Sequence, residues 1–280
     1  MTIRQWIVQQ VEQGHSPADL LAELVAVGWE EDRAVTLMTE ALQSRLSELQ
    51  SKNSADRTIP RSVVVPKPLV EKSATIIRAH DRDVRVLFTL EHPQVILFGS
   101  LLDDDECDEL IEQARRHMVA SNVIDVKTGG EQRHEHRTSS GMAFTRSATP
   151  LITRIERRIA ALLQWPVENG EALQMLCYEV GQEYRPHYDY MDPAHPGAAP
   201  FLARGGQRVA SLVMYLNTPT AGGATNFPDI GLEIAAVKGN AVFFSYDRPH
   251  PSTKTLHGGM PVREGEKWVA TKWLRESAHT

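Results

Sequence analysis

The sequence predicts an α+β protein: a double-stranded β-helix, or jelly roll, with supporting helices, preceded by a small N-terminal helical module. Three features predict this architecture. Short strand-like segments separated by turns fill the chain after Glu168, two amphipathic helical segments come before them, and a polar stretch with prolines separates both from helical residues at the N-terminus. Short strands at regular spacing after supporting helices are typical of an antiparallel double-sheet jelly roll.

Residues 1–46 predict a helical module. Ser16 followed by Pro17 is typical of a helix start, because serine caps the first turn and proline is tolerated in it. Gly28-Trp29 interrupts the apolar pattern, and a second helix is expected from about Glu30. A short bundle with a Gly-aromatic turn resembles the ubiquitin-associated type of helical module, which implies a protein partner. The alternative is an appendage that packs on the main domain or on a second subunit.

Residues 47–80 predict a linker, because this stretch is polar, contains prolines and lacks sustained periodicity. A second domain is expected over residues 81–280. It begins with two strand-like segments, and a helix with an acidic start follows, capped by Asp103 or Asp104. A second amphipathic helix is expected over residues 149–165. The strands expected after it are LQMLCYEV, YRPHYDY, RVASLVMYLN, LEIAAV, NAVFFSY and WVATKWL.

Composition narrows the class of protein. The chain has 280 residues, 41% of them hydrophobic, and a net charge of −6 with no long basic run, which argues against a nucleic-acid partner. No apolar run approaches transmembrane length, so no membrane partner is expected. Cys107 and Cys177 are too few for a disulfide framework. Because the N-terminus also lacks a signal-peptide pattern, we expect a protein of the reducing cytoplasm.

His187 and Asp189 are separated by one residue in a strand-like stretch, so their side chains point to the same face. Alone, this spacing is more often a solvent-facing histidine near an aspartate. His257 begins the turn before the last strand and offers a third ligand, so a metal site becomes the favoured interpretation of the pair. Two histidines and one carboxylate form the triangular face of non-heme Fe(II) sites, which leaves three coordination positions open. The sequence therefore predicts an iron site.

Lys267 begins the last strand, ten residues after the third expected ligand. Strand alternation places it on one face with Val269, Thr271 and Trp273. A lysine among apolar neighbours is costly to bury unless its charge is paired. We therefore expect Lys267 to hold the far carboxylate of a keto acid whose near end lies on the iron. Lys272, on the opposite face, is expected to be solvated.

Other histidines are weaker candidates. His134 and His136 have metal-pair spacing but lie in a charged, loop-like stretch, so exposed loop histidines are expected. His250 is the rival to His257 as third ligand, but it lacks both the following strand and a lysine at the right distance.

Two stretches rich in Gly, Pro or polar residues, 120–136 and 190–207, are expected to be lids over the site.

Three stretches resemble the prolyl 4-hydroxylase branch of the Fe(II)/2-oxoglutarate-dependent dioxygenases: LQMLCYEVGQEYRPHYDYMDP, RVASLVMYLNTPTAGGATNFPDIGLEIAAVKGNAVFFSY and LHGGMPVREGEKWVATKWLRE. The resemblance covers roughly residues 84–276 and includes RTSSGMAF and FGSLLDDDECDELIEQA upstream. Its most specific motifs are the HxD pair, the distal histidine, the lysine ten residues later and AGGATNFP between them.

The resemblance implies that the three expected ligands bind Fe(II) and that Lys267 pairs with the distal carboxylate of 2-oxoglutarate. Tyr178 would help to hold this co-substrate and Thr225 would line the same pocket, with ordinary barrel packing as the alternative for both. Arg137 and Tyr184 lie where the family approaches its peptide substrate. For Arg137 the alternative is a surface salt bridge.

The implied reaction is hydroxylation of a proline in a peptide or protein, with 2-oxoglutarate and O2 as co-substrates, succinate and CO2 as products, and ascorbate (vitamin C) as reductant. Another residue or a free amino acid is the alternative substrate. Aspartate at position 189 supports hydroxylation, because a small residue there would free a coordination site for halide. A non-catalytic interaction protein that retains the fold is the second hypothesis, and the intact set of ligands disfavours it.

Overall fold

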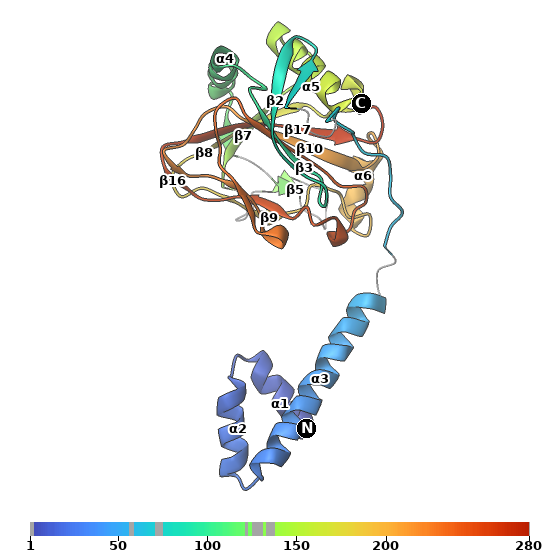
Figure 1. The fold of residues 1–280 in the computed structure, drawn as a ribbon, viewed down its shortest axis with the longest axis vertical. Helices are drawn as coiled ribbons and strands as arrows, with labels where there is room; N and C mark the ends of the chain where they lie inside the picture. Colours follow the sequence, from blue (N-terminus) through green and yellow to red (C-terminus); the bar gives the residue numbers. More distant parts are fainter. Residues whose placement is uncertain are drawn as a thin grey trace. The chain divides into compact units, whose positions relative to one another are not determined.

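The computed structural model describes residues 3–55, 59–70, 75–120, 123–124, 131–132 and 138–279. The chain divides into two compact units, Met1–Ile59 and Pro60–Thr280 (Figure 1). Within the described parts, none of the helices combines the length and the apolar composition that a bilayer crossing requires.

The first unit contains three helices, α1 (Ile3–Glu12), α2 (Pro17–Ala26) and α3 (Glu31–Ala55). Ser16 caps α2, because its hydroxyl accepts a hydrogen bond from the backbone N–H of Asp19, as expected from the Ser-Pro pair. The three helices bury a small apolar core of their own, made of Ile7, Leu20, Leu24, Ala34, Met38 and Ala41.

Helix α3 continues to Ala55, so the linker expected from residue 47 begins too early. The physical reason lies in residues 47–55, which are polar but contain neither proline nor glycine and so offer nothing that stops a helix. The other end of the expected linker also differs, because residues 76–79 form a strand that pairs with the next one.

The second unit is built from short strands and a few helices. Its strands are β1 (Ile76–Ala79), β2 (Arg82–Leu90), β3 (Val95–Gly99), β4 (Val119–Ala120), β5 (Val123–Ile124), β6 (Glu131–Gln132), β7 (Ser140–Phe144), β8 (Leu173–Tyr178), β9 (Tyr184–His187), β10 (Arg208–Tyr215), β11 (Ala221–Gly222), β12 (Thr225–Phe227), β13 (Leu232–Ile234), β14 (Ala241–Ser245), β15 (His257–Gly259), β16 (Val262–Glu264) and β17 (Lys267–Arg275). Its helices are α4 (Asp104–Arg115), α5 (Pro150–Leu163) and α6 (Ala199–Leu202), with short 3-10 turns η1 (Val167–Asn169), η2 (Pro196–Ala198), η3 (Pro228–Ile230) and η4 (Pro251–Thr253).

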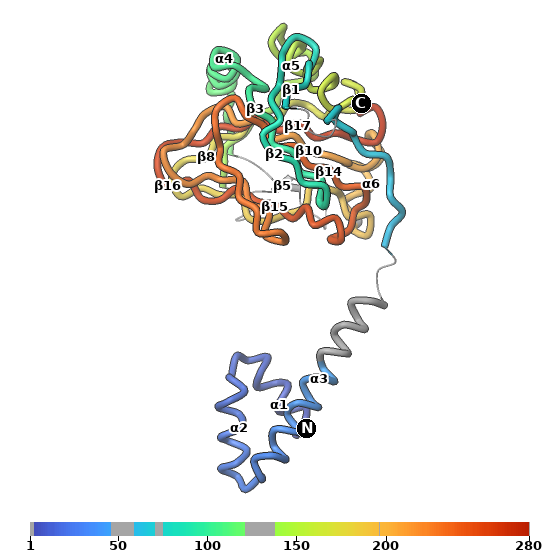
Figure 2. The backbone as a smooth tube through the Cα atoms, viewed as in Figure 1, coloured from blue at the N-terminus to red at the C-terminus, as the bar shows by residue number. Residues whose placement is uncertain are grey.

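Two antiparallel sheets form the jelly roll. The large sheet has the order β1-β2-β3-β14-β10-β17-β8-β7-β4, and the small sheet has the order β13-β12-β15-β9. The last strand, β17, therefore lies in the middle of the large sheet between β10 and β8, while the first strands of the unit lie at one edge, with β1 beside α5 (Figure 2). The jelly roll with supporting helices that the sequence predicted is confirmed.

The central strands of the large sheet, β14, β10, β17 and β8, bury both of their faces. Helices α4 and α5 cover the outer face of this sheet, where Leu110 of α4 and Ile155 of α5 join Met175 and Phe243 of the sheet in a large apolar core (Figure 1). Both helices start as expected: Asp103 forms a capping box with Glu106 at the start of α4, and Thr149 caps α5. The inner face packs against the small sheet in a second core, made of Val95, Leu176, Tyr178, Tyr215, Phe227, Ile234, Phe244, Tyr246 and Val269, among others.

Lys272 corrects one prediction. It lies on the outer face of β17, as alternation required, but it is buried rather than solvated, and its Nζ donates to Glu156 Oε1 of α5 at 2.6 Å. The sequence indicated which face carries Lys272 but not that a helix covers this face. The carboxylate of Glu156 compensates for the desolvation of the ammonium group.

Candidate metal and co-substrate site

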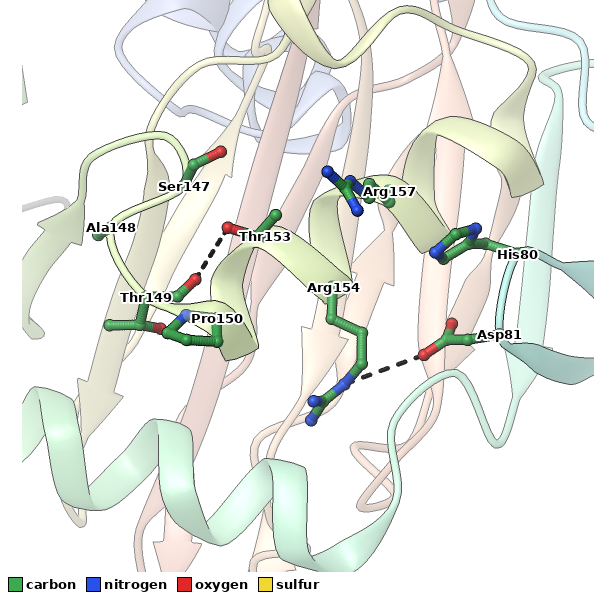
Figure 3. Close-up of a pocket in the computed structure, with 9 residues that line it drawn as sticks. All are labelled: His80, Asp81, Ser147, Ala148, Thr149, Pro150, Thr153, Arg154 and Arg157. Carbon is green, nitrogen blue, oxygen red and sulfur yellow. Dashed lines mark hydrogen bonds and ion pairs between the residues drawn. The ribbon is translucent and has the colours of Figure 1, made fainter.

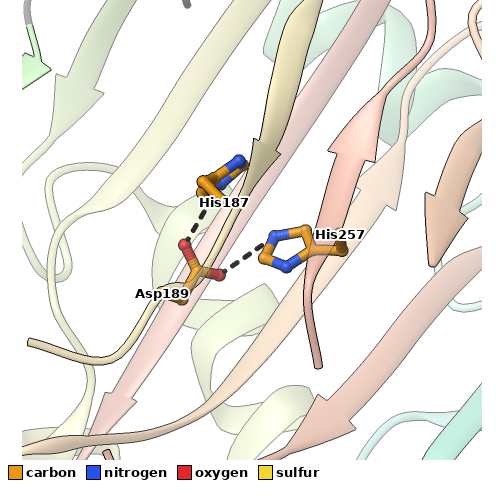
Figure 4. A group of neighbouring side chains, drawn as sticks. All are labelled: His187, Asp189 and His257. Carbon is orange, nitrogen blue, oxygen red and sulfur yellow. Dashed lines mark ion pairs between the residues drawn. The ribbon is translucent and has the colours of Figure 1, made fainter. Parts of the chain in front are cut away.

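Three side chains converge where edge strand β9 of the small sheet meets its neighbour β15. His187 ends β9 and His257 begins β15, and the two are direct partners across the antiparallel pair (Figure 4). Asp189 follows two residues after His187, and its carboxylate oxygens lie 3.5 Å from His187 Nε2 and 3.4 Å from His257 Nε2. One ligand atom from each residue lies within 4.8 Å of the others, and no other such group of His, Cys, Asp or Glu occurs among the described residues.

Each histidine is oriented by its own backbone. His187 Nδ1 contacts the carbonyl of Arg185 at 2.9 Å, and His257 Nδ1 contacts the carbonyl of Thr255 at 3.0 Å. Because a carbonyl can only accept, both Nδ1 atoms carry the proton, which leaves the Nε2 lone pairs free to bind a metal. Burial lowers the pKa of His257 to about 4, so this imidazole is a neutral ligand at neutral pH.

Asp189 supplies the negative ligand. Burial alone would raise the pKa of its carboxyl group, but the neighbouring His257 and His187 bring that pKa well below its usual range, so the group is ionised. The hydroxyl of Ser211 donates to Asp189 Oδ2 at 2.6 Å. Two neutral imidazole nitrogens and one carboxylate, brought together in this way, fit an Fe(II) ion.

Lys267 is a buried cation that pairs with no anion among the described residues. Its side chain lies in the core between the sheets, only 3% of the residue is exposed, and its Nζ forms no ion pair with any described residue. The Nζ atom instead lies 5.5 Å from the ring centre of Tyr178 and 5.9 Å from that of Tyr215. Burial lowers the pKa of Lys267 to about 8. A carboxylate from a bound molecule would pair this charge, so the residues present fit 2-oxoglutarate.

The metal ligands and Lys267 line the same pocket, which also includes Tyr178 and Thr225. Both residues were expected near the co-substrate, and the structure places both in the pocket that His187, Asp189, His257 and Lys267 line. Thr225 Oγ1 accepts a hydrogen bond from the hydroxyl of Tyr215 at 2.9 Å, and both residues are buried. Leu176, Val213 and Val269 add apolar walls to this pocket.

Tyr184 also lines this pocket, where its ring stacks on the ring of His187 with a centroid distance of 3.6 Å. This tyrosine, expected near the peptide substrate, therefore also packs against a candidate metal ligand. Arg137, the other residue assigned to the substrate, lies outside the described residues, as do His134 and His136.

The rejected rival His250 has a local role. It precedes η4, and its Nδ1 accepts a hydrogen bond from the backbone N–H of Ser252 at 3.1 Å, so it caps that turn.

Of the two expected lids, most of 120–136 lies outside the described residues. The lid expected over 190–207 contains η2 and α6. Its ends are joined because the Gln207 side chain bonds both the carbonyl and the N–H of Met191.

Several residues around the site were not identified from the sequence. Tyr215 and Ser211 lie on the inner face of β10 with Val213, and strand alternation in RVASLVMY could have placed them there. Tyr246, the residue directly after β14, contacts Ser211. Arg208 lies 3.9 Å from the ring centre of Trp273, and no local pattern in the sequence signals this contact.

A separate pocket lies between the β1–β2 turn and the start of α5 (Figure 3). Its walls include Arg154 and Arg157, and Arg154 pairs with Asp81 at 3.9 Å. His80 and Asp81 are the metal-ligating types among its described residues, and neither belongs to the His–Asp–His group. The His–Asp–His group therefore lies in a different pocket, between the two sheets.

Comparisons with known proteins agree with the fold and the donor set, which together define a 2-oxoglutarate- and Fe(II)-dependent oxygenase. The family model described as 2OG-Fe(II) oxygenase superfamily matches residues 173–275. Prolyl 4-hydroxylase 1 of Arabidopsis thaliana is 41% identical over 203 residues, covering 66% of this chain and 70% of that protein. Prolyl 4-hydroxylase 5 of the same plant is 39% identical over 204 residues, covering 65% of this chain and 68% of that protein.

Among solved structures, a viral collagen prolyl hydroxylase from Paramecium bursaria Chlorella virus-1, in complex with 2OG, is similar with a TM-score of 0.50 and 30% identity. The match covers 65% of this chain and 95% of the viral one. The chain therefore belongs to the prolyl 4-hydroxylase family of 2OG-Fe(II) oxygenases. It is a 2-oxoglutarate-dependent dioxygenase that uses Fe(II), 2-oxoglutarate and O2.

Proposed function

We propose that this dioxygenase hydroxylates a prolyl residue in a peptide or protein and releases succinate and CO2. The proposal rests on a single pocket that holds both the His–Asp–His group and Lys267, whose cation has no ion-pair partner among the described residues. The identity of 41% to a prolyl 4-hydroxylase supports proline as the target.

The residues that line this pocket have distinct roles in the proposed reaction. The Nε2 atoms of His187 and His257 and the carboxylate of Asp189 would hold the metal, which when bound couples decarboxylation of 2-oxoglutarate to activation of dioxygen. Lys267 would bind the distal carboxylate of the co-substrate and so fix its orientation. The apolar walls of the pocket exclude water around the reacting groups.

We also propose ascorbate as the reductant, the cytoplasm as the location and a protein partner for the N-terminal helices. The location is supported by Cys107 and Cys177, which are free thiols buried in the protein. Burial raises the pKa of each to about 12, so both stay protonated and unreactive.

The test uses the full chain with Fe(II), 2-oxoglutarate, O2 and proline-rich peptides. We expect succinate to form and the peptide to gain the mass of one oxygen atom at proline. Peptides with each proline replaced by alanine and the variant His187→Ala serve as controls. Succinate without a modified proline in any peptide, or modification of the alanine peptides, contradicts proline as the target. No succinate under any condition contradicts the enzyme itself.

A further inference from the structure

A chain of buried hydroxyl groups leads from the large sheet to the metal-binding carboxylate. Tyr246 follows directly after β14, and its OH lies 2.9 Å from Ser211 Oγ on the neighbouring strand β10. Ser211 Oγ in turn lies 2.6 Å from Asp189 Oδ2. Ser211 is fully buried and only 2% of Tyr246 is exposed, so no bulk water replaces these contacts.

The direction of both hydrogen bonds follows from counting protons. The ionised carboxylate of Asp189 can only accept, so Ser211 must give it its single hydroxyl proton. The oxygen of Ser211 must then accept from the hydroxyl of Tyr246, which needs its own proton to donate. Burial raises the pKa of Tyr246 well above its ordinary value, so this hydroxyl remains a donor. The chain of hydrogen bonds therefore runs from the Tyr246 hydroxyl to Ser211 and from Ser211 to Asp189.

Asp189 needs such support because it lies beyond the end of β9, outside the regular strand pairing. A hydrogen bond to one carboxylate oxygen prevents the group from rotating about its last side-chain bond. Tyr246 itself is held firmly, because its N–H donates to the carbonyl of Val209 at 2.9 Å and its ring packs edge-on against Tyr190. The support thus begins on a rigid part of the large sheet.

We propose that Tyr246 is a positioning residue for the metal ligand Asp189: acting through Ser211, its hydroxyl anchors Oδ2 to the protein and leaves Oδ1 for the metal. The inference rests on the proposed function, since it takes Asp189 as a ligand. Groups that orient metal ligands typically change metal affinity by about 10- to 100-fold when they are removed.

The experiment measures Mn(II) affinity of the full chain by calorimetry in the absence of 2-oxoglutarate, so the result does not depend on turnover. We expect Ser211→Ala to weaken Mn(II) binding by about 10- to 100-fold and Tyr246→Phe by roughly 3- to 10-fold. The double variant should bind as weakly as Ser211→Ala alone, because Tyr246 acts only through Ser211. At saturating Fe(II), neither single variant should change the KM for 2-oxoglutarate.

Ser245→Ala is the matched control. It removes a hydroxyl from the residue next to Tyr246, but that hydroxyl donates to Gln94 Oε1 at 2.6 Å and has no contact with Asp189. The control should bind Mn(II) as the unmodified protein does. Melting temperatures of all variants without metal separate a loss of packing from a loss of positioning.

Two results overturn the proposal. One is a Tyr246→Phe protein that binds Mn(II) as tightly as the Ser245→Ala control, whatever its melting temperature. The other is a double variant in which the two losses multiply. The variant His187→Ala separates a failure of this inference from a failure of the proposed function. If His187→Ala binds Mn(II) like the unmodified protein, the proposed metal site is wrong. If His187→Ala does not bind Mn(II) but Tyr246→Phe binds it normally, only the role of Tyr246 is contradicted.

Discussion

The two faces of strand β17 each bury a lysine, and the two lysines differ in how their charge is matched. On the outer face, Lys272 is paired with Glu156 of α5 at 2.6 Å. On the inner face, Lys267 has two tyrosine rings near it and no carboxylate among the described residues. A buried charge matched within the protein contributes to the fold, whereas an unmatched one destabilises the free protein and favours a ligand of opposite charge. This difference is the basis for proposing that the co-substrate binds on the inner side of the sheet.

The largest expected effect comes from the metal ligands on the inner side. His187→Ala removes one of three protein ligands, so we expect loss of Mn(II) binding and of succinate formation. Calorimetry and a succinate assay measure both. His250→Ala is the control, because that histidine caps η4, and it should leave both unchanged. Equal loss in the control would contradict the choice of His257 over His250.

On the outer face, the substitution Lys272→Met should lower the stability of the protein. The substitution leaves the buried carboxylate of Glu156 without its cation, so the free energy of unfolding should fall by about 3–5 kcal/mol. Denaturant titration measures this change. The KM for 2-oxoglutarate should stay the same in the folded fraction. A variant as stable as the unmodified protein would show that the pair contributes nothing to the fold.

The matched substitution on the inner face is Lys267→Met. It should impair co-substrate binding and leave stability intact, the opposite of what is expected for Lys272→Met. We expect the KM for 2-oxoglutarate to rise on the order of 100-fold, or about 2–3 kcal/mol, because the distal carboxylate loses its partner. Stability without co-substrate should stay the same or increase, since an unmatched buried charge is removed. An unchanged KM would refute the role of Lys267.

The smallest effect is a pH dependence of co-substrate binding. Burial lowers the pKa of Lys267 to about 8, so the free protein loses this cation as the pH rises through that value. Because the protonated form binds the carboxylate, the KM for 2-oxoglutarate should be flat below pH 7 and rise above pH 8, by about tenfold per pH unit. The slope should be absent in Lys267→Met, and its persistence there would assign it to another group.

The sequence was most informative where spacing along one strand decides the geometry. The one-residue interval between His187 and Asp189, and the interval from His257 to Lys267, placed all four residues in one pocket. Alternation on β17 also assigned Lys267 and Lys272 to opposite faces correctly. The jelly roll followed from the same short alternating segments.

What the sequence could not supply depends on contacts between distant elements. Ser211 and Tyr246 are 35 residues apart, and only the pairing of β10 with β14 brings them together. Lys272 and Glu156 are 116 residues apart and meet because α5 covers the sheet. The helix over residues 47–55 was missed because its polar side chains carry no apolar periodicity.

A structure of the protein with Mn(II) and 2-oxoglutarate tests the contrast between the two lysines most directly. We expect the keto-acid end on a metal held by His187, Asp189 and His257, and the distal carboxylate paired with Lys267 Nζ. The pair between Lys272 and Glu156 should be unchanged. A structure in which 2-oxoglutarate binds elsewhere, or in which Lys267 stays unpaired beside the bound co-substrate, would contradict the account.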